Sequence, residues 1–405
     1  MKLRKFIVSS LLGLLCYAGA WARVYSGLEV LRQNDFDVLQ GKRVGLITNP
    51  TGVDAELRST IDILHDAPQV KLTALFAPEH GVRGNVAAGA GVSSQTDART
   101  GLTVHSLYGR TRKPTAEMLS RVDALVYDIQ DNGCRSYTYI STLGKAMEAC
   151  AEHGKEMVVL DRPNPLGGVR VEGCIAEDDC ISFVSQYHIP YIYGLTVGEL
   201  AHWINHNVLN DKVKLTVVPM QGWARDMTYE QTELPWVPTS PNMPTAATAT
   251  FYPATGILGE LSVASIGANY TMPFRVVCNE WVDADELAAR LTALNLTGVM
   301  FRPVHITPPG SKQLHGVEIY IPNLSAVKSL TLIQFYVMQE LAAMAPDRAA
   351  FKEAAADRLS MFDKVCGSKE VRKLFSKNYL VSDMLDYWQK DADEFRKLTE
   401  NLKLY

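Results

Sequence analysis

Short apolar strands alternate with helices in the first half of the chain, and this alternation limits the folds that the sequence can adopt. The predicted strands are residues 43–48, 71–76, 122–127 and 156–160, and the predicted helices are residues 59–65 and 139–153. Strands this apolar are typical of a parallel sheet that is covered on both faces. Strands separated by helices form βαβ units with right-handed crossovers. The sequence therefore predicts an α/β fold that is built on a parallel sheet.

A polar cluster follows each of these four strands. The clusters contain Asn49 after the first strand, Glu79 and His80 after the second, Asp128 after the third and Asp161 after the fourth. Open α/β sheets bind their ligands at the edge formed by the carboxyl ends of the strands. One such cluster alone is weak evidence for a binding site, because Asn, Asp, Gly and Pro also form turns. Four clusters that carry carboxylates and arginines favour a binding site at this edge.

Composition and charge exclude some classes of protein. The chain has 405 residues, of which 47% are apolar and 21% are charged, as in soluble globular proteins. It contains 40 Lys and Arg against 44 Asp and Glu, so its net charge is −4. A general nucleic-acid-binding protein has a basic excess, and we therefore expect no nucleic-acid partner. The length predicts two domains, or one large domain with an appendage.

Residues 1–22 have the pattern of a secretory signal peptide. Lys2, Arg4 and Lys5 form a basic region, an apolar stretch follows, and Ala20-Trp21-Ala22 is a small-x-small cleavage site. The apolar stretch is far shorter than the roughly 20 residues of a transmembrane helix. We therefore expect an exported protein, periplasmic or secreted, with no stable membrane insertion.

The second half of the chain begins near Val169 and alternates less regularly. Helices are predicted at 197–208, 283–294 and 329–344, and strands at 214–218, 298–306 and 317–321. An irregular stretch from Met220 to Thr255 is rich in Trp, Pro, Asn and Thr. Its aromatic content argues against disorder, and long ordered loops are usually functional. We expect a signal peptide at 1–22, an N-terminal domain at 23–168, and a second α/β domain at 169–405 with a helical C-terminal tail.

Several common reaction motifs are absent from the sequence. There is no Gly-x-Ser-x-Gly elbow, no P-loop, no His-Glu-x-x-His and no dinucleotide-binding Gly-x-Gly-x-x-Gly. There is also no Cys-x-x-Cys, so a zinc ribbon is disfavoured. Cys174 and Cys180 are the best candidates for a disulfide, and the alternative is that the cysteines are ordinary buried thiols. We expect no cofactor and no metal.

Carboxylates remain as candidate catalytic groups. Glu79 lies at a strand end beside His80, and a carboxyl group in a partly desolvated cleft has a raised pKa and can act as a general acid. The alternative for Glu79 is a turn or helix cap. Asp128 and Asp131 flank Gln130, and they either interact with substrate or serve as turn residues. His80 either assists Glu79 or is a structural histidine.

Arginines in the same segments are candidate ligands for an anion. Arg83, Arg135 and Arg162 follow three of the strands, and a guanidinium binds a carboxylate through two parallel hydrogen bonds. The alternative is that each pairs with a neighbouring acid, as Arg162 would with Asp161.

Aromatic side chains in these segments offer flat apolar faces for sugar rings. Tyr137, Tyr139, Trp223 and Trp236 are the candidates, although core packing is the commoner use of any single one. Carboxylates, arginines and aromatic residues in an acidic exported chain favour a glycan hydrolase that acts on an anionic sugar.

Longer motifs occupy the same segments. In the first half they are APEHG at 77–81, SLYG at 106–109, DIQDNG at 128–133, RSYTY at 135–139 and DRPNPLGG at 161–168. Looser motifs follow, namely EG at 172–173, LTVGELA at 195–201, WAR at 223–225 and PNMP at 241–244. Together they resemble the exo-β-N-acetylmuramidases of the NamZ type, glycoside hydrolase family 171, long known only as a domain of unknown function. The resemblance extends from about Val24 to the C-terminus.

The resemblance implies release of N-acetylmuramic acid from the non-reducing end of peptidoglycan fragments, with muropeptides or disaccharides as partners. It implies a Rossmann-like N-terminal domain, a smaller second α/β domain, an active site in the cleft between them, and no cofactor. Glu79 is by resemblance the leading catalytic carboxylate, and the second catalytic group is not assigned. If the N-acetyl group of the substrate assists the reaction, Asp128 or Asp131 orients that group.

The predicted site combines these candidates. The candidate catalytic residues are Glu79, His80, Asp128 and Asp131. The candidate substrate-binding residues are Asn49, Arg83, Gln130, Arg135, Tyr137, Tyr139, Asp161, Arg162, Asn164, Glu172, Trp223 and Asn242. The lactyl carboxylate of N-acetylmuramic acid suits the arginines in this set.

The chain departs from the family pattern at three places. Cys174 replaces a common proline, residues 267–271 replace a common Gly-Arg-Gly-Thr, and Tyr193-Gly194 replaces a common His-Gly. These departures bear on the preference for the leaving group more than on the reaction type. Two other functions stay open, a non-catalytic muropeptide-binding or sugar-binding protein and a secreted esterase or deacetylase.

Overall fold

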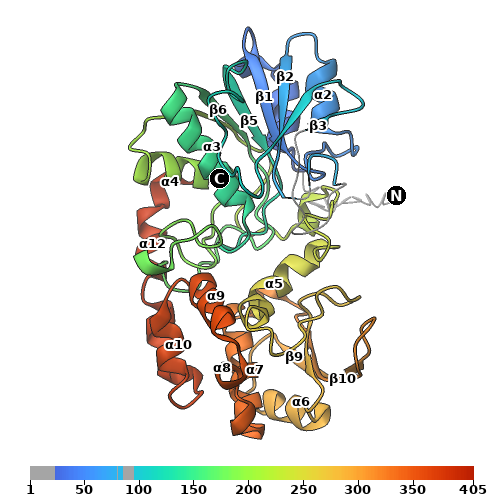
Figure 1. Cartoon of the computed structure of the whole chain (residues 1–405), viewed down its shortest axis with the longest axis vertical. Coiled ribbons are helices and arrows are strands. Elements are labelled where there is room, and N and C mark those ends of the chain that lie inside the picture. Colours follow the sequence, from blue (N-terminus) through green and yellow to red (C-terminus); the bar gives the residue numbers. More distant parts are fainter. Residues whose placement is uncertain (1–22, 80, 85–94) are drawn as a thin grey trace, which may run out of the picture.

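The chain folds into two parts that are stacked along its long axis (Figure 1). The structure is a computed structural model that describes residues 23–79, 81–84 and 95–405. One part is built on a sheet of seven strands and the other on a sheet of three strands. This confirms the predicted α/β fold with a second, smaller domain. The predicted signal peptide and His80 lie outside the described residues.

The larger sheet has the strand order β3-β4-β2-β1-β5-β6-β7. Its strands are β1 (Arg43–Thr48), β2 (Lys71–Ala77), β3 (Gln95–Thr96), β4 (Thr103–Ser106), β5 (Ala124–Asp128), β6 (Glu156–Leu160) and β7 (Lys214–Val218). All neighbours pair in parallel except β3, which is antiparallel to β4. The chain crosses over after each parallel strand, so the carboxyl ends of these strands lie at one edge.

Helices cover both faces of this sheet (Figure 1). They are α1 (Gly27–Gln33), α2 (Thr60–Asp66), α3 (Tyr139–His153) and α4 (Val197–Asn207). Residues of α1 and α2 pack with Leu46 and Val126 on one face, and residues of α3 and α4 pack with Ile47 and Leu125 on the other. Successive strand residues therefore enter different cores, which is why these strands are apolar throughout.

The larger sheet includes a strand from beyond the predicted domain boundary at residues 168 and 169. β7 pairs in parallel with β6, from Glu156 opposite Lys214 to Leu160 opposite Val218. The chain between β6 and β7 forms α4, which packs on the same sheet. The α/β unit that begins with β1 therefore continues at least to Val218.

The smaller domain packs helices on an antiparallel sheet. Its strands are β8 (Val276–Asn279), β9 (Met300–Ile306) and β10 (Leu314–Tyr320), in the order β8-β10-β9. Its helices are α5 (Ala246–Gly259), α6 (Ala284–Ala293), α7 (Thr331–Met344), α8 (Ala350–Glu353), α9 (Ala356–Cys366), α10 (Lys369–Phe375) and α11 (Leu385–Gln389). One apolar core joins these elements to Tyr191 and Ile192 of the first half.

The prediction that irregular chain continues to Thr255 is wrong, because α5 begins at Ala246. Threonines, two glycines and Pro253 give this segment a low helix propensity, so propensity alone does not predict the helix. The helix has no polar face, because most of its residues are buried, in contact with α7 and α9. Tertiary packing therefore stabilises a helix that its own sequence does not favour.

The C-terminal segment returns to the larger sheet (Figure 1). Phe395 of α12 (Ala392–Leu398) packs beside Trp203 of α4 in the core of the N-terminal part. Tyr405 donates its hydroxyl to Asp161 Oδ2 at 2.6 Å and accepts the Met220 N–H at 2.8 Å. The last residue of the chain is therefore bound at the carboxyl end of β6.

The cysteines of the described residues are free thiols. All six are buried, and the structure contains no bond between Cys174 and Cys180; they are Cys134, Cys150, Cys174, Cys180, Cys278 and Cys366.

No helix among the described residues is long and apolar enough to cross a membrane.

Arg135 binds the two parts of the molecule together. Its guanidinium is fully buried and donates to the carbonyl oxygens of Cys174 (3.0 Å) and Ile189 (2.5 Å) on one side. On the other side it donates to the carbonyl oxygens of Val365 (3.1 Å) and Cys366 (2.7 Å) at the end of α9. A buried charge is tolerated here because nearly every N–H has an acceptor.

We expect Arg135→Met to lower the free energy of unfolding by at least about 3 kcal/mol, because it leaves several buried carbonyl groups without a donor. Chemical denaturation measures this loss. Arg43→Met is the control, since Arg43 forms a half-exposed pair with Asp123, and it should cost no more than about 1 kcal/mol. Equal losses in the two variants would contradict the role of Arg135.

We expect Tyr405→Phe to destabilise the protein more at pH 8 than at pH 5. Burial raises the pKa of Asp161 to about 6, and the Tyr405 hydrogen bond opposes that shift because it favours the carboxylate. Without the hydroxyl, this pKa rises further, so the loss is largest where Asp161 is ionised, at about 2 kcal/mol. Unfolding curves of this variant and of Tyr25→Phe at both pH values test the prediction. A loss that does not change with pH would refute it.

Candidate active site

The centre of the larger sheet provides a switch point for ligand binding. β1 and β5 are neighbours, β2 pairs with the other side of β1, and β6 pairs with the other side of β5. The loops after β1 and β5 therefore turn away from each other, which opens a crevice at the carboxyl edge. Asn49 follows β1, Glu79 follows β2, and residues 129–139 follow β5. The predicted strand-end clusters thus lie at this edge.

A cavity of about 380 Å³ lies next to these strand ends. Both halves of the chain line it, with Glu79 and residues 136–139 from the N-terminal part and Tyr252, Glu260 and Phe274 from the C-terminal part. Residues 240–242 of the irregular stretch complete the lining. Its volume is within the range of sites for small molecules.

Glu79 is half-buried in the turn that follows β2. Gly81, two residues later, has φ of 79°, a conformation that favours glycine, so the chain turns sharply after the carboxylate. The hydroxyl of Tyr108, which follows β4, interacts with Glu79, and burial together with this hydrogen bond raises the pKa of Tyr108. Neighbouring strands therefore position both groups.

Two tyrosines on the segment after β5 are close enough to two carboxylates to be affected by their charges. Burial raises the pKa of Tyr137 and of Tyr139, and the charges of both Glu79 and Asp131 raise each further. The Tyr137 hydroxyl shares a hydrogen bond of 2.6 Å with Thr239 Oγ1, and the Tyr139 hydroxyl donates to the Thr239 carbonyl at 2.6 Å. Both phenols therefore stay neutral at pH 7 and are fixed in place.

Aromatic rings from both parts form one side of the cavity. Tyr137 contacts Tyr252 edge-on with ring centroids 5.7 Å apart, and Tyr252 contacts Phe274 in the same way at 4.9 Å. All three side chains are half-buried, so part of each faces the cavity. Phe274 has φ of 62°, which is unusual for a bulky residue and places its ring at the end of the row. Such a surface can stack against the apolar face of a sugar.

Asp131 is buried in the loop after β5. Its Oδ2 accepts hydrogen bonds from the Tyr193 hydroxyl and from the Gly133 N–H at 2.8 Å. Burial raises the pKa of Asp131 to about 6, although both hydrogen bonds favour the carboxylate. The Tyr193 hydroxyl thus holds the Asp131 carboxylate in place.

Asp128 and Arg162 pair with each other inside the protein. Arg162 donates to both Asp128 oxygens, at 2.5 and 2.9 Å, and Thr60 donates to Asp128 Oδ2 at 2.5 Å. Neither residue lines the cavity. Arg162 Nη2 also donates to the Val53 carbonyl oxygen. The pair therefore connects the loops after β1, β5 and β6.

Asp161 also has an internal role. It accepts hydrogen bonds from Thr196 Oγ1, the Gly198 N–H and the Arg162 N–H, as well as from Tyr405. These contacts fix the beginning of α4 against the end of β6. The expected pairing of Asp161 with the Arg162 side chain is replaced by the Asp128 pair.

Three predicted amides bind backbone groups of the strand-end loops. Asn49 Oδ1 accepts the Thr51 N–H at 3.0 Å, and Gln130 Nε2 donates to the Pro163 carbonyl at 2.7 Å. Asn164 Nδ2 donates to the Leu195 carbonyl at 2.9 Å. These side chains therefore shape the loops around the crevice.

The arginines expected to bind an anion are engaged within the protein. Arg83 is exposed and forms ion pairs with Asp97 and Asp62. Arg135 is buried and donates to carbonyl groups of both parts, as described above. Their guanidinium groups and that of Arg162 do not line the cavity with Glu79. Asn242 does line it and is held by Asn269, whose N–H it accepts at 2.7 Å.

Glu172 and Trp223 lie away from this cavity. Glu172 accepts hydrogen bonds from the Leu330 and Thr331 N–H groups at the start of α7. Trp223 packs in a small core and meets Tyr405 edge-on, with ring centroids 5.1 Å apart.

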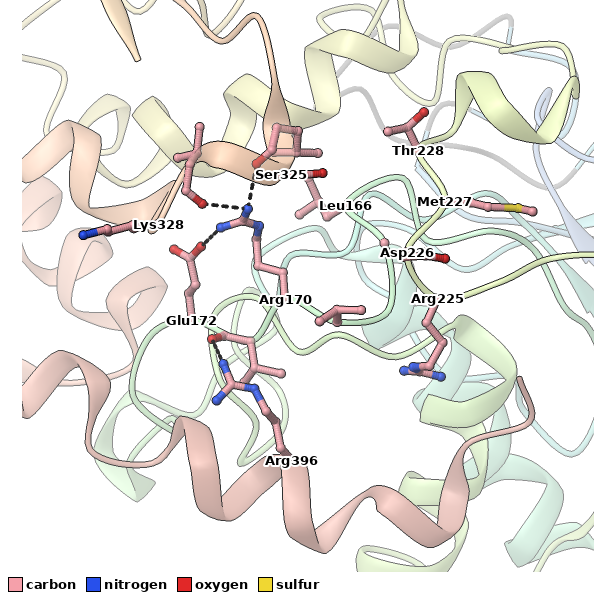
Figure 2. Close-up of a pocket in the computed structure, with 15 residues that line it drawn as sticks. Leu166, Arg170, Glu172, Arg225, Asp226, Met227, Thr228, Ser325, Lys328 and Arg396 are labelled. Atoms are coloured by element: carbon pink, nitrogen blue, oxygen red, sulfur yellow. Dashed lines mark hydrogen bonds and ion pairs between the residues drawn. The ribbon is translucent and has the colours of Figure 1, made fainter. Parts of the chain in front are cut away.

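A second cavity of about 350 Å³ lies where the two parts meet (Figure 2). Arg170 extends across it to Glu172 and to the carbonyl oxygens of Leu324 and Val327. Arg396 of α12 donates to the Val171 carbonyl at 3.1 Å. The contacts of Arg170 with the carbonyl oxygens of Leu324 and Val327, drawn as dashed lines in Figure 2, thus connect the two parts at this cavity.

Sequence reasoning missed several residues of the first cavity. Tyr252 and Phe274 lie far along the chain from the strand-end motifs, and the helix that contains Tyr252, α5, was not predicted. Neither Phe274 nor Glu260 is among the predicted site residues. Among residues 23–79, 81–84 and 95–405, no group of three or more His, Cys, Asp or Glu is placed to hold a metal ion.

Comparison with known families gives matches over most of the chain. A family model described as "Exo-beta-N-acetylmuramidase NamZ, N-terminal" matches residues 44–247. A second, described as "Exo-beta-N-acetylmuramidase NamZ, C-terminal", matches residues 250–405. The two matches meet within α5, so the cavity with Glu79 lies between the regions that they cover.

Individual proteins are similar over nearly the full length. The chain is 41% identical over 387 residues to the peptidoglycan beta-N-acetylmuramidase NamZ of Bacillus subtilis (strain 168), which covers 95% of this chain and 92% of that protein. A crystal structure of a DUF1343 family protein from Bacteroides fragilis is 54% identical, with a TM-score of 0.90, 95% of this chain covered and 99% of that chain. A second from the same organism is 27% identical, with a TM-score of 0.74 and the same coverage.

We expect Asp128→Asn to act on stability. The substitution leaves the buried Arg162 charge without a carboxylate, and loss of one partner of a buried ion pair costs about 3 kcal/mol or more. Denaturation by urea measures the loss. The folded variant at low temperature should keep kcat within about tenfold of wild type, because Asp128 does not line the cavity. A stable variant without activity would contradict this role.

Proposed function

This chain belongs to the family of NamZ exo-beta-N-acetylmuramidases, and we propose that it releases N-acetylmuramic acid from the non-reducing ends of peptidoglycan fragments. It is a glycosidase whose substrates derive from peptidoglycan. The observation that carries the assignment of the active site is the cavity in which Glu79 faces an aromatic wall contributed by both parts. A cavity of about 380 Å³ suits one sugar unit at the end of a glycan, as exo action requires.

Glu79 is the group that we assign to proton transfer. Cleavage of a glycosidic bond needs an acid that protonates the leaving oxygen, and a carboxyl group is the usual donor in glycosidases. Glu79 projects from a turn fixed by β2 and interacts with Tyr108, so its position is set by the sheet. The half-buried rings of Tyr137, Tyr252 and Phe274 then hold the sugar face.

Apart from Glu260, which is paired with Arg358, neutral groups line the remainder of the cavity. Ser136, Thr138, Ser240 and Asn242 offer hydroxyl and amide donors that can bind the hydroxyl groups and the lactyl carboxylate of the sugar. The three arginines predicted for that carboxylate are held elsewhere by internal ion pairs and carbonyl groups. Recognition of the lactyl group in the described part of the cavity is therefore assigned to neutral donors.

Export of the protein is also part of the proposal. It is supported by the basic region, the short apolar stretch and the small-x-small site in residues 1–22. An exported enzyme meets peptidoglycan fragments where they are produced, in the periplasm or outside the cell.

We expect Glu79→Gln to fold normally and to lose at least about 10²-fold in kcat on a chromogenic β-N-acetylmuramide, because the amide cannot donate the proton. The matched control is Glu156→Gln, at the opposite edge of the same sheet, where Glu156 pairs with Lys42 and Lys214. That control should keep kcat within about twofold.

Near-wild-type turnover by Glu79→Gln would refute the assignment of the acid. Mass analysis of products from a muramyl disaccharide tests the activity itself. Tight binding of the disaccharide without release of a sugar would instead favour a muropeptide-binding protein.

A further inference from the structure

Glu260 is a second carboxylate in the cavity that holds Glu79. It caps the carboxyl end of α5 in the smaller domain, whereas Glu79 follows β2 of the larger sheet. The proposed reaction uses Glu79 for proton transfer and gives Glu260 no role. Glu260 is half-buried, and a carboxylate that lines a cavity for sugars is a strong acceptor for hydroxyl groups. Its contacts therefore bear on which sugars the cavity accepts.

Arg358 of α9 fixes the position of Glu260. Its Nε donates to the Glu260 carbonyl oxygen at 2.6 Å, and its Nη2 donates to Glu260 Oε2 at 2.7 Å. One planar guanidinium thus binds both the backbone and the carboxylate of the same residue. Oε1 has no hydrogen-bond partner among the described residues and is not enclosed by protein. Glu260 therefore carries one acceptor oxygen that a ligand in the cavity can use.

The two carboxylates act on different rings of the aromatic wall. Burial raises the pKa of Tyr137 and the charge of Glu79 raises it further, whereas for Tyr252 burial raises the pKa and Glu260 adds to it. The centroids of these two rings are 5.7 Å apart, and Phe274 continues the row beyond Tyr252. A sugar ring that stacks on this row therefore has Glu79 toward Tyr137 and Glu260 toward Tyr252 and Phe274.

The proposed substrate offers few hydroxyl groups to such an acceptor. In a terminal N-acetylmuramic acid, C1 carries the leaving oxygen, C2 the acetamido group and C3 the lactyl ether. Hydroxyl groups remain only at C4 and C6, and C4 lies across the six-membered ring from C1. When the leaving oxygen on C1 faces Glu79, the C4 hydroxyl lies on the side of the ring that is away from Glu79.

We propose that Glu260 Oε1 accepts a hydrogen bond from the C4 hydroxyl of the terminal N-acetylmuramic acid and thereby selects chain ends. This inference rests on the proposed function. Inside a glycan chain the C4 oxygen is bonded to the next sugar and has no hydrogen to donate. A site built to bind a hydroxyl group rejects a ligand that lacks it, because the polar group of the site is then left without a partner. Glu260 is therefore a specificity residue for exo action.

Arg358 allows this contact to form beside the lactyl carboxylate on C3. Two carboxylates on neighbouring positions repel each other, and the guanidinium compensates the charge of Glu260. Burial raises the pKa of Glu260, and Arg358 opposes that shift because it favours the ionised form. An ionised carboxylate only accepts hydrogen bonds, as the C4 hydroxyl requires. Arg358 is thus a positioning residue that acts through Glu260.

The test compares kcat/KM for two substrates, a chromogenic β-N-acetylmuramide and its 4-deoxy analogue. We expect wild type to prefer the 4-hydroxy substrate by about 10²-fold, since the analogue leaves a charged acceptor unpaired. Glu260→Ala should reduce this preference at least tenfold. Glu260→Gln, which keeps the size of the side chain without its charge, should reduce it at least threefold.

The 4-deoxy substrate separates specificity from catalysis. It has no C4 hydroxyl for Glu260 to bind, so wild type and Glu260→Ala should cleave it with kcat/KM values within about threefold of each other. Glu340→Ala is the matched control, because Glu340 pairs with Arg290 in the same domain and does not line the cavity. It should leave the preference unchanged. A ratio of two kcat/KM values does not depend on the fraction of protein that is folded.

An unchanged preference in Glu260→Ala would overturn the inference. Equal losses of about 10²-fold on both substrates would overturn it too, because they would assign Glu260 to the chemical step. Wild type that cleaves both substrates equally well would refute the inference while the proposed function stands. Wild type that cleaves neither would count against the function itself.

Discussion

The buried guanidinium of Arg135 is the contact on which the placement of the site depends. It belongs to the segment after β5 that also carries Asp131, Tyr137 and Tyr139, and its donors reach carbonyl groups of both parts of the molecule. Because α9 and the 174–189 region close around one side chain, the strand-end segment has one position relative to the smaller domain. The aromatic wall depends on that position, since Tyr137 comes from one part and Tyr252 from the other.

Most charged side chains at the carboxyl edge of the sheet bind loops to one another. Asp128 pairs with Arg162, and Asp161 holds the start of α4 and the end of the chain. Internal carboxylates of this kind are costly to bury, and each is compensated by several donors. The edge is rigid for this reason, and a rigid edge holds Glu79, Tyr137 and Tyr139 in place before substrate arrives.

The sequence specified the central strands well because they are continuous apolar segments between turns. β1, β6, β7 and α3 have the predicted bounds, and the strand-end clusters lie at one edge as expected. The roles of the individual side chains in those clusters could not be predicted from the sequence. An arginine that binds an anion and one that binds carbonyl groups, as Arg135 does, look alike in a sequence. α5 was missed because its burial replaces amphipathic periodicity, and with it Tyr252 was missed.

Strand order limits the roles that Glu79 and Asp131 can share. Glu79 follows β2 and Asp131 follows β5, and β1 lies between them, so their backbones are about two strand spacings apart, or roughly 10 Å. A carboxylate pair in which one member attacks the sugar is closer, at about 5–5.5 Å. Asp131 also does not line the cavity with Glu79, so Glu79 and Asp131 do not form such a pair, and the role of Asp131 is to hold the loop after β5 through Tyr193 and Gly133.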